Sequence, residues 1–155
     1  MPAADRPSIP ASYGIEPTSR GHLLDWERAE AKLAAASNYW VATASARGTP
    51  HASPVWGIWH QGAFYFGTEP RSRKGRDLAA NPVAVVHLES GDDVVILEGT
   101  VSGLLPDEVS DEPDAAYADK YGLPLRGNHV FRLVPRRAFG WSEADFTKSA
   151  TRWTF

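Results

Sequence analysis

Residues 39–68 read YWVATASARGTPHASPVWGIWHQGAFYFGT, and they contain three extended segments joined by two turns. Aromatic and β-branched residues fill the segments 39–45, 51–60 and 63–68, as is typical of strands. A Gly and a Pro fall in the first connection, and Gln61-Gly62 is short enough for a tight hairpin. This stretch therefore predicts three consecutive antiparallel strands.

The strand pattern continues along the chain. The complete set of expected strands is 39–45, 51–60, 63–68, 83–89, 94–105 and 130–141, the last in two pieces that divide near Arg136. Apolar residues at helical spacing predict a helix from Gly21 to about Ala36, with Ser19 as its N-cap. A short helix is expected over 73–80, and another in the acidic segment 106–121.

This pattern predicts a mainly β protein in which six antiparallel strands form a closed or nearly closed barrel. Closure removes the unpaired strand edges that promote aggregation. We expect residues 1–20, which are rich in proline, to form an extended arm. Residues 21–155 contain no repeat or linker and are expected to form a single domain.

Composition excludes several classes of function. The net charge of −3 argues against binding to nucleic acid or an anionic membrane, which needs a cationic surface. The chain has no cysteine, so disulfides, thiol catalysis and zinc–thiolate sites are excluded. No apolar run approaches the roughly 20 residues that span a bilayer. The first residues are polar and proline-rich rather than leader-like, so we expect a cytoplasmic protein.

The six tryptophans leave two interpretations open. They lie at positions 26, 40, 56, 59, 141 and 153. Large aromatic side chains commonly fill cores and subunit interfaces, but they also stack against flat ligands.

The segment Thr68–Arg76 is the strongest candidate for a binding site. Four of the sixteen basic residues fall within six positions, 71–76, of an otherwise acidic protein. Ser72 stands at the expected N-cap of the helix 73–80, so free backbone amides, a hydroxyl and the side chains of Arg73 and Lys74 converge there. Such a set binds anions, phosphate above all. The alternative is a solvated basic loop that leads into a surface helix.

Other common sites are absent from the sequence. It has no G-x-x-x-x-G-K-[ST] loop, no G-x-G-x-x-G turn and no G-x-S-x-G nucleophile elbow. Its five histidines lack the spacing of metal ligands, so no metal site is expected.

The order of these motifs resembles the pyridoxamine-5′-phosphate-oxidase-like family. The resemblance begins with His51-Ala-Ser-Pro-Val-Trp56 and Thr68, continues through Ser72-Arg-Lys and Asn81-Pro-Val, and includes the strand Val94–Gly99. Trp141, followed eleven positions later by Arg152, resembles the closing Trp and Arg of that family. The match is good over residues 35–105 and looser over 130–155.

The resemblance implies a six-stranded split β-barrel of Greek-key type that acts as a homodimer. It further implies that FMN, or the deazaflavin F420, lies in grooves between the two subunits. Arg73 and Lys74 would hold the cofactor phosphate, and residues 53–56 would run beside the ring, mainly through backbone groups. Carried over to this chain, the cofactor-binding residues are Ser53, Pro54, Val55, Trp56, Thr68, Ser72, Arg73, Lys74, Trp141 and Arg152, with Arg71 as a nearby helper.

The sequence departs from true pyridoxamine-phosphate oxidases at three places. Gly57 stands near the position of a basic residue, and Val94 aligns with a flavin-binding Gln. The residues that bind the substrate phosphate are missing, and Tyr117, Lys120, Tyr121 and Arg126 stand in a different arrangement. We therefore expect an FMN-dependent oxidoreductase of the flavin/deazaflavin reductase branch, which acts on a small electron-accepting molecule.

Three alternatives remain open. F420 would need a longer basic track, for which Arg71, Arg76, Arg136 and Arg137 are candidates. The protein could instead bind or sequester a flavin without catalysis, or handle haem through His87 or His129. Because a flavin ring carries its own redox chemistry, no residue can be named as catalytic from the sequence.

Overall fold

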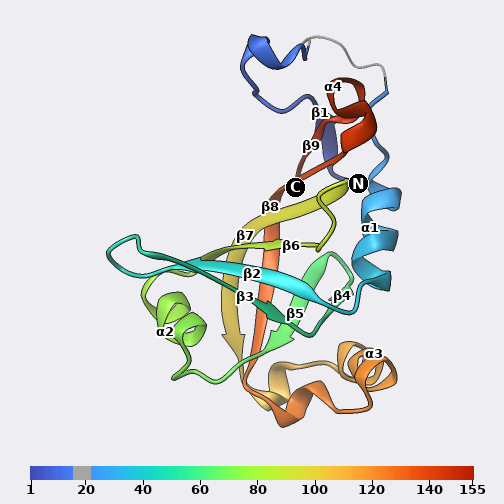
Figure 1. Cartoon of the computed structure of the whole chain (residues 1–155). Helices are drawn as coiled ribbons and strands as arrows, with labels where there is room; N and C mark the ends of the chain where they lie inside the picture. Colours follow the sequence, from blue (N-terminus) through green and yellow to red (C-terminus); the bar gives the residue numbers. More distant parts are fainter. Residues whose placement is uncertain (16–21) are drawn as a thin grey trace.

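Residues 50–60 form the strand that closes the barrel. In the computed structural model, which describes residues 1–15 and 22–155, β3 (Pro50–Val55) pairs with β2 (Tyr39–Ala44) and β4 (Gly57–His60) pairs with β5 (Ala63–Gly67). The strand bends at Trp56 between these two partners, so one continuous run of chain is shared by both halves of the barrel (Figure 1).

The other three strands complete the circuit. They are β6 (Val83–His87), β7 (Asp93–Leu104) and β8 (Val130–Ser142). The hydrogen-bonded order is β3-β2-β6-β7-β8-β5-β4, and every pair in it is antiparallel. If the bent run 50–60 counts as one strand, six strands enclose the barrel. The prediction of a mainly β, antiparallel six-stranded barrel is therefore confirmed, and the neighbours β2–β6 and β5–β8 give it Greek-key connections.

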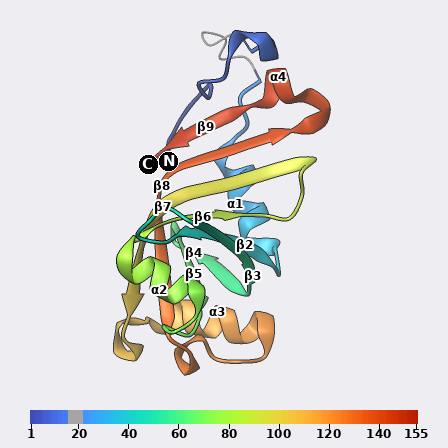
Figure 2. The same cartoon turned by 60° about the vertical axis from the view of Figure 1, so that its left-hand side comes forward.

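Two short strands extend the sheet beyond the barrel. β9 (Thr151–Thr154) pairs with β8, and β1 (Ala3–Asp5) pairs with β9. A strand thus lies within the segment that the sequence analysis treated as an extended arm. Figures 1 and 2 both place β1, β9 and the short helix α4 (Phe146–Ser149) at the opposite end of the molecule from α3 (Asp111–Tyr121).

The strand ends agree with the predictions to within one residue, apart from β6 and β8 and the interruption of the predicted strand 51–60 at Trp56. β6 ends at His87, two residues early, and β8 is one strand of thirteen residues rather than two pieces. The division expected near Arg136 is instead a bulge, because Glu98 pairs with Arg137 and Gly99 pairs with Pro135. Arg136 is the extra residue, and the chain continues in the same strand on either side of it.

Helix α1 (Trp26–Ala35) covers one opening of the barrel and begins later than predicted. Its buried side chains are Trp26, Ala29 and Leu33, which lie on one face of the helix. Leu24 precedes the helix, because its backbone N–H donates to Thr151 Oγ1 at 2.8 Å and so holds the chain against β9. Asp25 occupies the N-cap position, and the predicted cap Ser19 lies outside the described residues.

The core contains three of the six tryptophans. Trp26 is buried, and its ring meets those of Trp59, Trp153 and Phe155 edge-on at centroid distances of 5.9, 5.3 and 4.9 Å. Edge-to-face packing of this kind is favourable beyond the area it buries. Within residues 1–15 and 22–155, no helix has the length and apolar character needed to cross a membrane.

The remaining helices lie at the ends of the barrel. α2 (Arg73–Ala80) agrees with its predicted bounds, and α3 lies within the acidic segment 106–121, with Pro113 in its first turn. Single 3₁₀ turns cover Ala11–Tyr13, Pro106–Glu108, Leu125–Gly127 and Glu143–Asp145.

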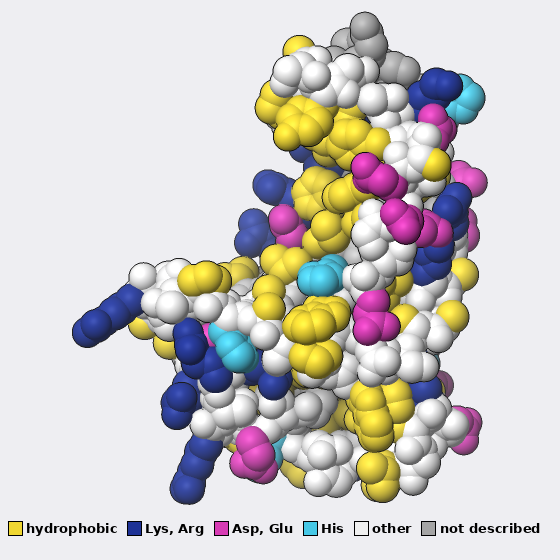
Figure 3. All heavy atoms as spheres, in the orientation of Figure 1, with side chains coloured by type: hydrophobic (Ala, Val, Ile, Leu, Met, Phe, Trp, Pro, Cys, Tyr) yellow, Lys and Arg dark blue, Asp and Glu magenta, His cyan; other side chains and the backbone are white. Residues whose placement is uncertain are grey.

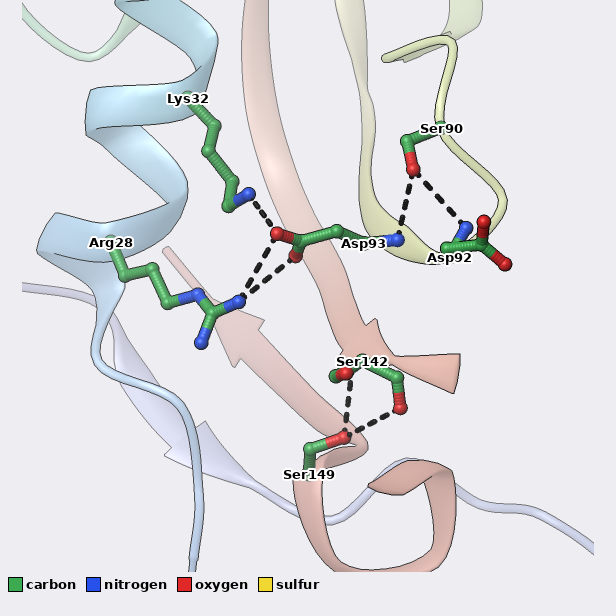
Figure 4. Close-up of polar contacts among 7 residues, drawn as sticks. All are labelled: Arg28, Lys32, Ser90, Asp92, Asp93, Ser142 and Ser149. Carbon is green, nitrogen blue, oxygen red and sulfur yellow. Dashed lines mark hydrogen bonds and ion pairs between the residues drawn. The ribbon is translucent and has the colours of Figure 1, made fainter. Parts of the chain in front are cut away.

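One carboxylate connects α1 to the first residue of β7. Asp93 accepts hydrogen bonds from Arg28 Nη2 at 3.1 Å to each oxygen, and it is paired with Lys32 as well (Figure 4). Burial alone would raise the pKa of Asp93, but the hydrogen bonds and charges of Lys32 and Arg28 lower it below its ordinary value of 3.8.

Asp93→Asn should destabilise the protein by about 1 kcal/mol or less at pH 7, because the pair is partly exposed and screened by water. Since folding lowers the pKa of this carboxyl group, its stabilising effect is present above pH 3.8 and is lost as the pH falls further. Urea unfolding at pH 7 and pH 3 should show the difference between variant and parent shrinking at low pH. The matched control is Asp92→Asn, because among the described residues the Asp92 carboxylate has no ion-pair partner. A difference of equal size at both pH values would contradict this account.

Candidate cofactor-binding site

The loop after β5 and the first turn of α2 form an anion-binding geometry. Ser72 caps the helix as predicted, since its Oγ accepts from the backbone N–H of Gly75 at 3.1 Å. Thr68 Oγ1 lies 3.2 Å from Ser72 Oγ, so the two hydroxyls adjoin. The N–H groups of Arg73 and Lys74 belong to the first helical turn, where no carbonyl of the helix can accept from them. Two hydroxyls and two amides therefore gather at the positive end of the helix.

Gly75 allows the loop to fold over this turn. A Cβ built on Gly75 would meet the carbonyl oxygens of Pro70 and Glu69 at 2.5 and 2.6 Å. The loop backbone thus lies directly on the helix, and this holds Thr68 beside Ser72. The sequence analysis missed this role, although a glycine in the first turn of a short helix was a signal for it.

The basic side chains around Ser72 differ in how free they are. Arg73 Nε lies 3.6 Å from the carboxylate of Asp77, one turn along the helix. Asp77 is buried and accepts from Thr43 Oγ1 at 2.8 Å, so it anchors α2 to β2. Among the described residues, Arg71 and Lys74 have no ion-pair partner. Figure 3 shows Lys and Arg side chains gathered on this side of the molecule.

The edge of β3 lies next to this loop. β3 is bonded on one side only, to β2, and Pro54 suits such an edge because proline cannot donate a hydrogen bond. Gly57 pairs with Phe66, and Val55 lies two residues before Gly57 while Thr68 lies two residues after Phe66, so both leave the same end of the β4–β5 ladder. The Ser53 hydroxyl is buried without a partner, so it does not face the edge. Only backbone groups and the Trp56 ring remain there for a ligand.

Tyr121, at the end of α3, fixes the bend beside this edge. Its hydroxyl accepts from the N–H of Gly57 at 3.1 Å and donates to the carbonyl of Gly57 at 2.8 Å. Trp56 is 48 % exposed and stacks on the Tyr121 ring, with 4.9 Å between centroids and 7° between planes. Burial raises the pKa of Tyr121, which keeps its hydroxyl protonated. The contact between α3 and Trp56 could not be predicted from the sequence, because Trp56 and Tyr121 are 65 positions apart.

The neighbouring basic residues of this region have structural partners. The Lys120 ammonium donates to Tyr39 Oη at 2.8 Å, and burial lowers the pKa of Lys120. Arg126 Nε donates to the carbonyl of Val109 at 2.9 Å, and Arg126 Nη2 donates to Asp111 at 2.7 Å. These cations hold α3 in place and are not available to an anionic ligand.

Trp141 and Arg152 lie far from Ser72 within one chain. Arg152 is in β9, where Asp5 of β1 pairs with its guanidinium. Trp141 is the penultimate residue of β8. In Figure 1, β9 lies toward the top of the molecule and α2 at its lower left, so the two elements are well apart. The structure therefore joins Thr68 to the start of α2 and places residues 53–56 at the same end of the β4–β5 ladder, whereas Trp141 and Arg152 lie in β8 and β9.

The histidines and acids form no metal site. No group of three or more His, Asp or Glu side chains within residues 1–15 and 22–155 could hold a metal ion. His87 stacks on Trp40 with 5° between the ring planes, and its Nδ1 lies 2.8 Å from the Leu88 carbonyl. His129 lies 3.8 Å from Glu69 at the surface.

The chain matches one protein family model and resembles several solved structures in fold. The family model described as pyridoxamine 5′-phosphate oxidase matches residues 26–142. No curated protein matches the sequence. An F420 reductase of similar fold is 22 % identical, with a TM-score of 0.53 over 68 % of this chain and 90 % of that one. An FAD-binding protein from Mesorhizobium loti is 18 % identical, with a TM-score of 0.58 over 85 % of this chain and 96 % of that one. The haem storage protein HutZ from Vibrio cholerae is 17 % identical, with a TM-score of 0.56 over 71 % of this chain and 87 % of that one.

Gly75→Ala should destabilise the protein by about 1–3 kcal/mol, because the new methyl group overlaps backbone oxygens that cannot move independently. This is opposite to the usual effect of replacing glycine by alanine within a helix. Gly91→Ala is the control, because nothing lies within 4 Å of a Cβ at that position. Chemical unfolding of both variants measures the effect, and an unchanged or raised midpoint for Gly75→Ala would show that the loop does not lie on the helix.

Proposed function

Because its residues 26–142 match the family model, the chain belongs to the pyridoxamine 5′-phosphate oxidase family, and we propose that it is an oxidoreductase that uses FMN. The observation that carries the proposal is the start of α2. There the hydroxyls of Thr68 and Ser72 adjoin two free helix amides, and Arg71, Arg73 and Lys74 stand in the same loop and first helical turn. Charge-assisted hydrogen bonds to a phosphate are among the strongest that a protein makes.

The described residues fit FMN along its length. The phosphate would lie at Ser72, and the ring would lie along the free edge of β3 beside Trp56. The bound flavin would supply the hydride and electron chemistry. The chain would position it, since Tyr121 holds the Trp56 ring and Gly75 holds the loop at Thr68. The substrate would be a small electron-accepting molecule.

Pyridoxamine phosphate itself is not the substrate we propose. Arg126 is bound to Asp111 and to the carbonyl of Val109, and Lys120 is held by Tyr39. No cation of the segment 117–126 is therefore left to bind a substrate phosphate beside Trp56.

F420 is the second candidate cofactor. Arg71 and Arg76 are exposed and have no ion-pair partner among the described residues, so they could extend the positive surface toward a longer anionic tail. The similar fold of an F420 reductase also supports this candidate. Haem handling, or flavin binding without catalysis, is distinguished by the absorption spectrum and turnover of the purified protein. Haem would give a Soret band and would require His87 or His129 as a ligand.

We also propose that the active protein is a homodimer. One row of outward-facing residues crosses the sheet in register, namely Pro54, Trp40, His87, Ile96, Phe139 and Arg152. Most of its members are apolar and only partly buried, and Figure 3 shows hydrophobic side chains with a histidine among them on this face. In a two-fold dimer the two ends of such a row face each other. Arg152 of one copy would then approach the β3 edge of the other copy, although β9 and β3 lie apart within a single chain.

Arg73→Ala or Lys74→Ala should weaken FMN binding about ten- to hundredfold, because each removes a charged partner of the phosphate. Stability without cofactor should change by no more than a few tenths of a kcal/mol for Lys74→Ala, which breaks no ion pair. Isothermal titration with FMN, F420 and riboflavin measures binding, and thermal melts measure stability.

Two controls sharpen this titration. Riboflavin has no phosphate, so its affinity should not change in either variant. Arg76→Ala removes an equal charge from the same helix, and it should weaken F420 without affecting FMN. If both cofactors bind both phosphate-site variants as tightly as the parent, the proposed site is wrong.

Ile96→Glu should convert the dimer to a monomer, because it places a charge in the middle of the proposed interface. Leu123→Glu is the control, since Leu123 is exposed next to α3 and away from this face. Sedimentation equilibrium at micromolar concentration measures the association. A parent protein that is monomeric with FMN bound, or an Ile96→Glu variant that stays dimeric, would contradict the proposed dimer.

A further inference from the structure

A pocket of about 460 Å³ opens on the outer face of the barrel, apart from the proposed cofactor site. Its lining comes from β2, β6, β7, β8 and the residue that follows α2. Small side chains create the space, notably those of Ala42 and Ala44, and Val83 and Val85 provide an apolar wall. Pockets of this size commonly take small organic ligands.

The bulge in β8 places two arginines at this pocket. Arg136 is the unpaired residue of the bulge, and Arg137 pairs with Glu98 across the strands. Strand residues normally alternate between the two faces of a sheet, but a bulge interrupts the alternation. Both Arg136 and Arg137 are consequently exposed on the outer face and line the pocket. Gly99, on the partner strand, leaves room for the bulge, since a Cβ there would meet the Val134 carbonyl at 2.3 Å.

The charges of these arginines are not neutralised by hydrogen-bonded partners. Among the described residues, neither guanidinium makes an ion pair or a hydrogen bond. Glu98 also lines the pocket, but it forms no ion pair with Arg137 despite facing it in the register. Two cations and one carboxylate leave the pocket with a net positive charge, in a protein whose total charge is −3.

This pocket is separate from the site at Ser72. It contains none of the residues assigned above to FMN, although Arg136 and Arg137 were considered for the tail of F420, and it adjoins Asn81, which follows the far end of α2. Eight helical residues rise by about 12 Å, so the two anion-binding regions lie at opposite ends of the same helix.

We propose that this pocket binds a small organic anion, with its apolar body against Ala42, Val83 and Val85 and its phosphate or carboxylate between Arg136 and Arg137. Guanidinium groups bind both kinds of anion in a bidentate manner, so the chemistry of the head group is shared between the two sources. Glu98 opposes the anion and limits the affinity.

Phenyl phosphate and benzoate are the two probes, and titration calorimetry on the full-length protein measures them. Arg136→Ala and Arg137→Ala should each weaken the preferred probe about tenfold or more. Glu98→Gln should strengthen it, because a repulsive charge is removed. Ala42→Leu should weaken the probes but not inorganic phosphate, because the leucine fills the apolar part of the pocket. The comparison of the two probes identifies phosphate or carboxylate as the preferred head group.

Two controls separate this pocket from the cofactor site. Lys148→Ala removes an equal charge from α4, at the far end of the molecule, and should leave probe binding unchanged. Lys74→Ala should also leave it unchanged, while Arg137→Ala should leave FMN affinity unchanged. Probe binding therefore tests the pocket independently of whether FMN is the cofactor.

Three outcomes would overturn the proposal. The first is that neither probe binds the parent protein. The second is that both arginine variants bind the probes as well as the parent. The third is that the arginine variants lose dimerisation in sedimentation while the parent binds no probe, which would assign the pocket to the contact between two copies.

Discussion

The bend at Trp56 and Gly57 is the constraint on which the rest of the structure depends. On one side of it the chain is bonded to β2, and on the other side to β5, so the bend joins the two halves of the barrel. Gly57 is required there because a Cβ would lie 2.2 Å from the Phe64 ring. The Tyr121 hydroxyl accepts from the N–H of Gly57 and donates to its carbonyl, and the Lys120 ammonium lies 3.5 Å from the same carbonyl, so both polar groups of the bend have partners.

The same bend creates the candidate site. Because β3 leaves β5 at this point, its outer edge is unpaired, and the chain after β5 is free to turn into the loop before α2. The loop stays close because Gly75 lets it lie on the helix, and the helix stays close because Asp77 bonds Thr43. An open strand edge and a positive helix end are thus neighbours as a consequence of barrel closure.

Local features of this arrangement could be predicted from the sequence, and long-range ones could not. The hairpin at Gln61-Gly62, the bounds of α2 and the cap at Ser72 depend on residues a few positions apart, and they agree with the structure. The late start of α1 depends on Thr151, and the stack on Trp56 depends on Tyr121. The bulge at Arg136 depends on Gly99 in another strand, so the sequence of β8 alone indicated only an interruption.

Net charge hides how the positive charge is distributed. A total of −3 argues against a broadly cationic surface, but binding depends on the local field rather than on the sum. Asp77, Asp93 and Asp111 are each paired with cations that hold helices in place, whereas Arg71, Lys74, Arg136 and Arg137 have no such partner among the described residues. These three acids thus hold helices in place, and the four unpaired bases lie near the two ends of α2. The two sites proposed above both depend on such local groups of unpaired bases, which a total charge of −3 does not reveal.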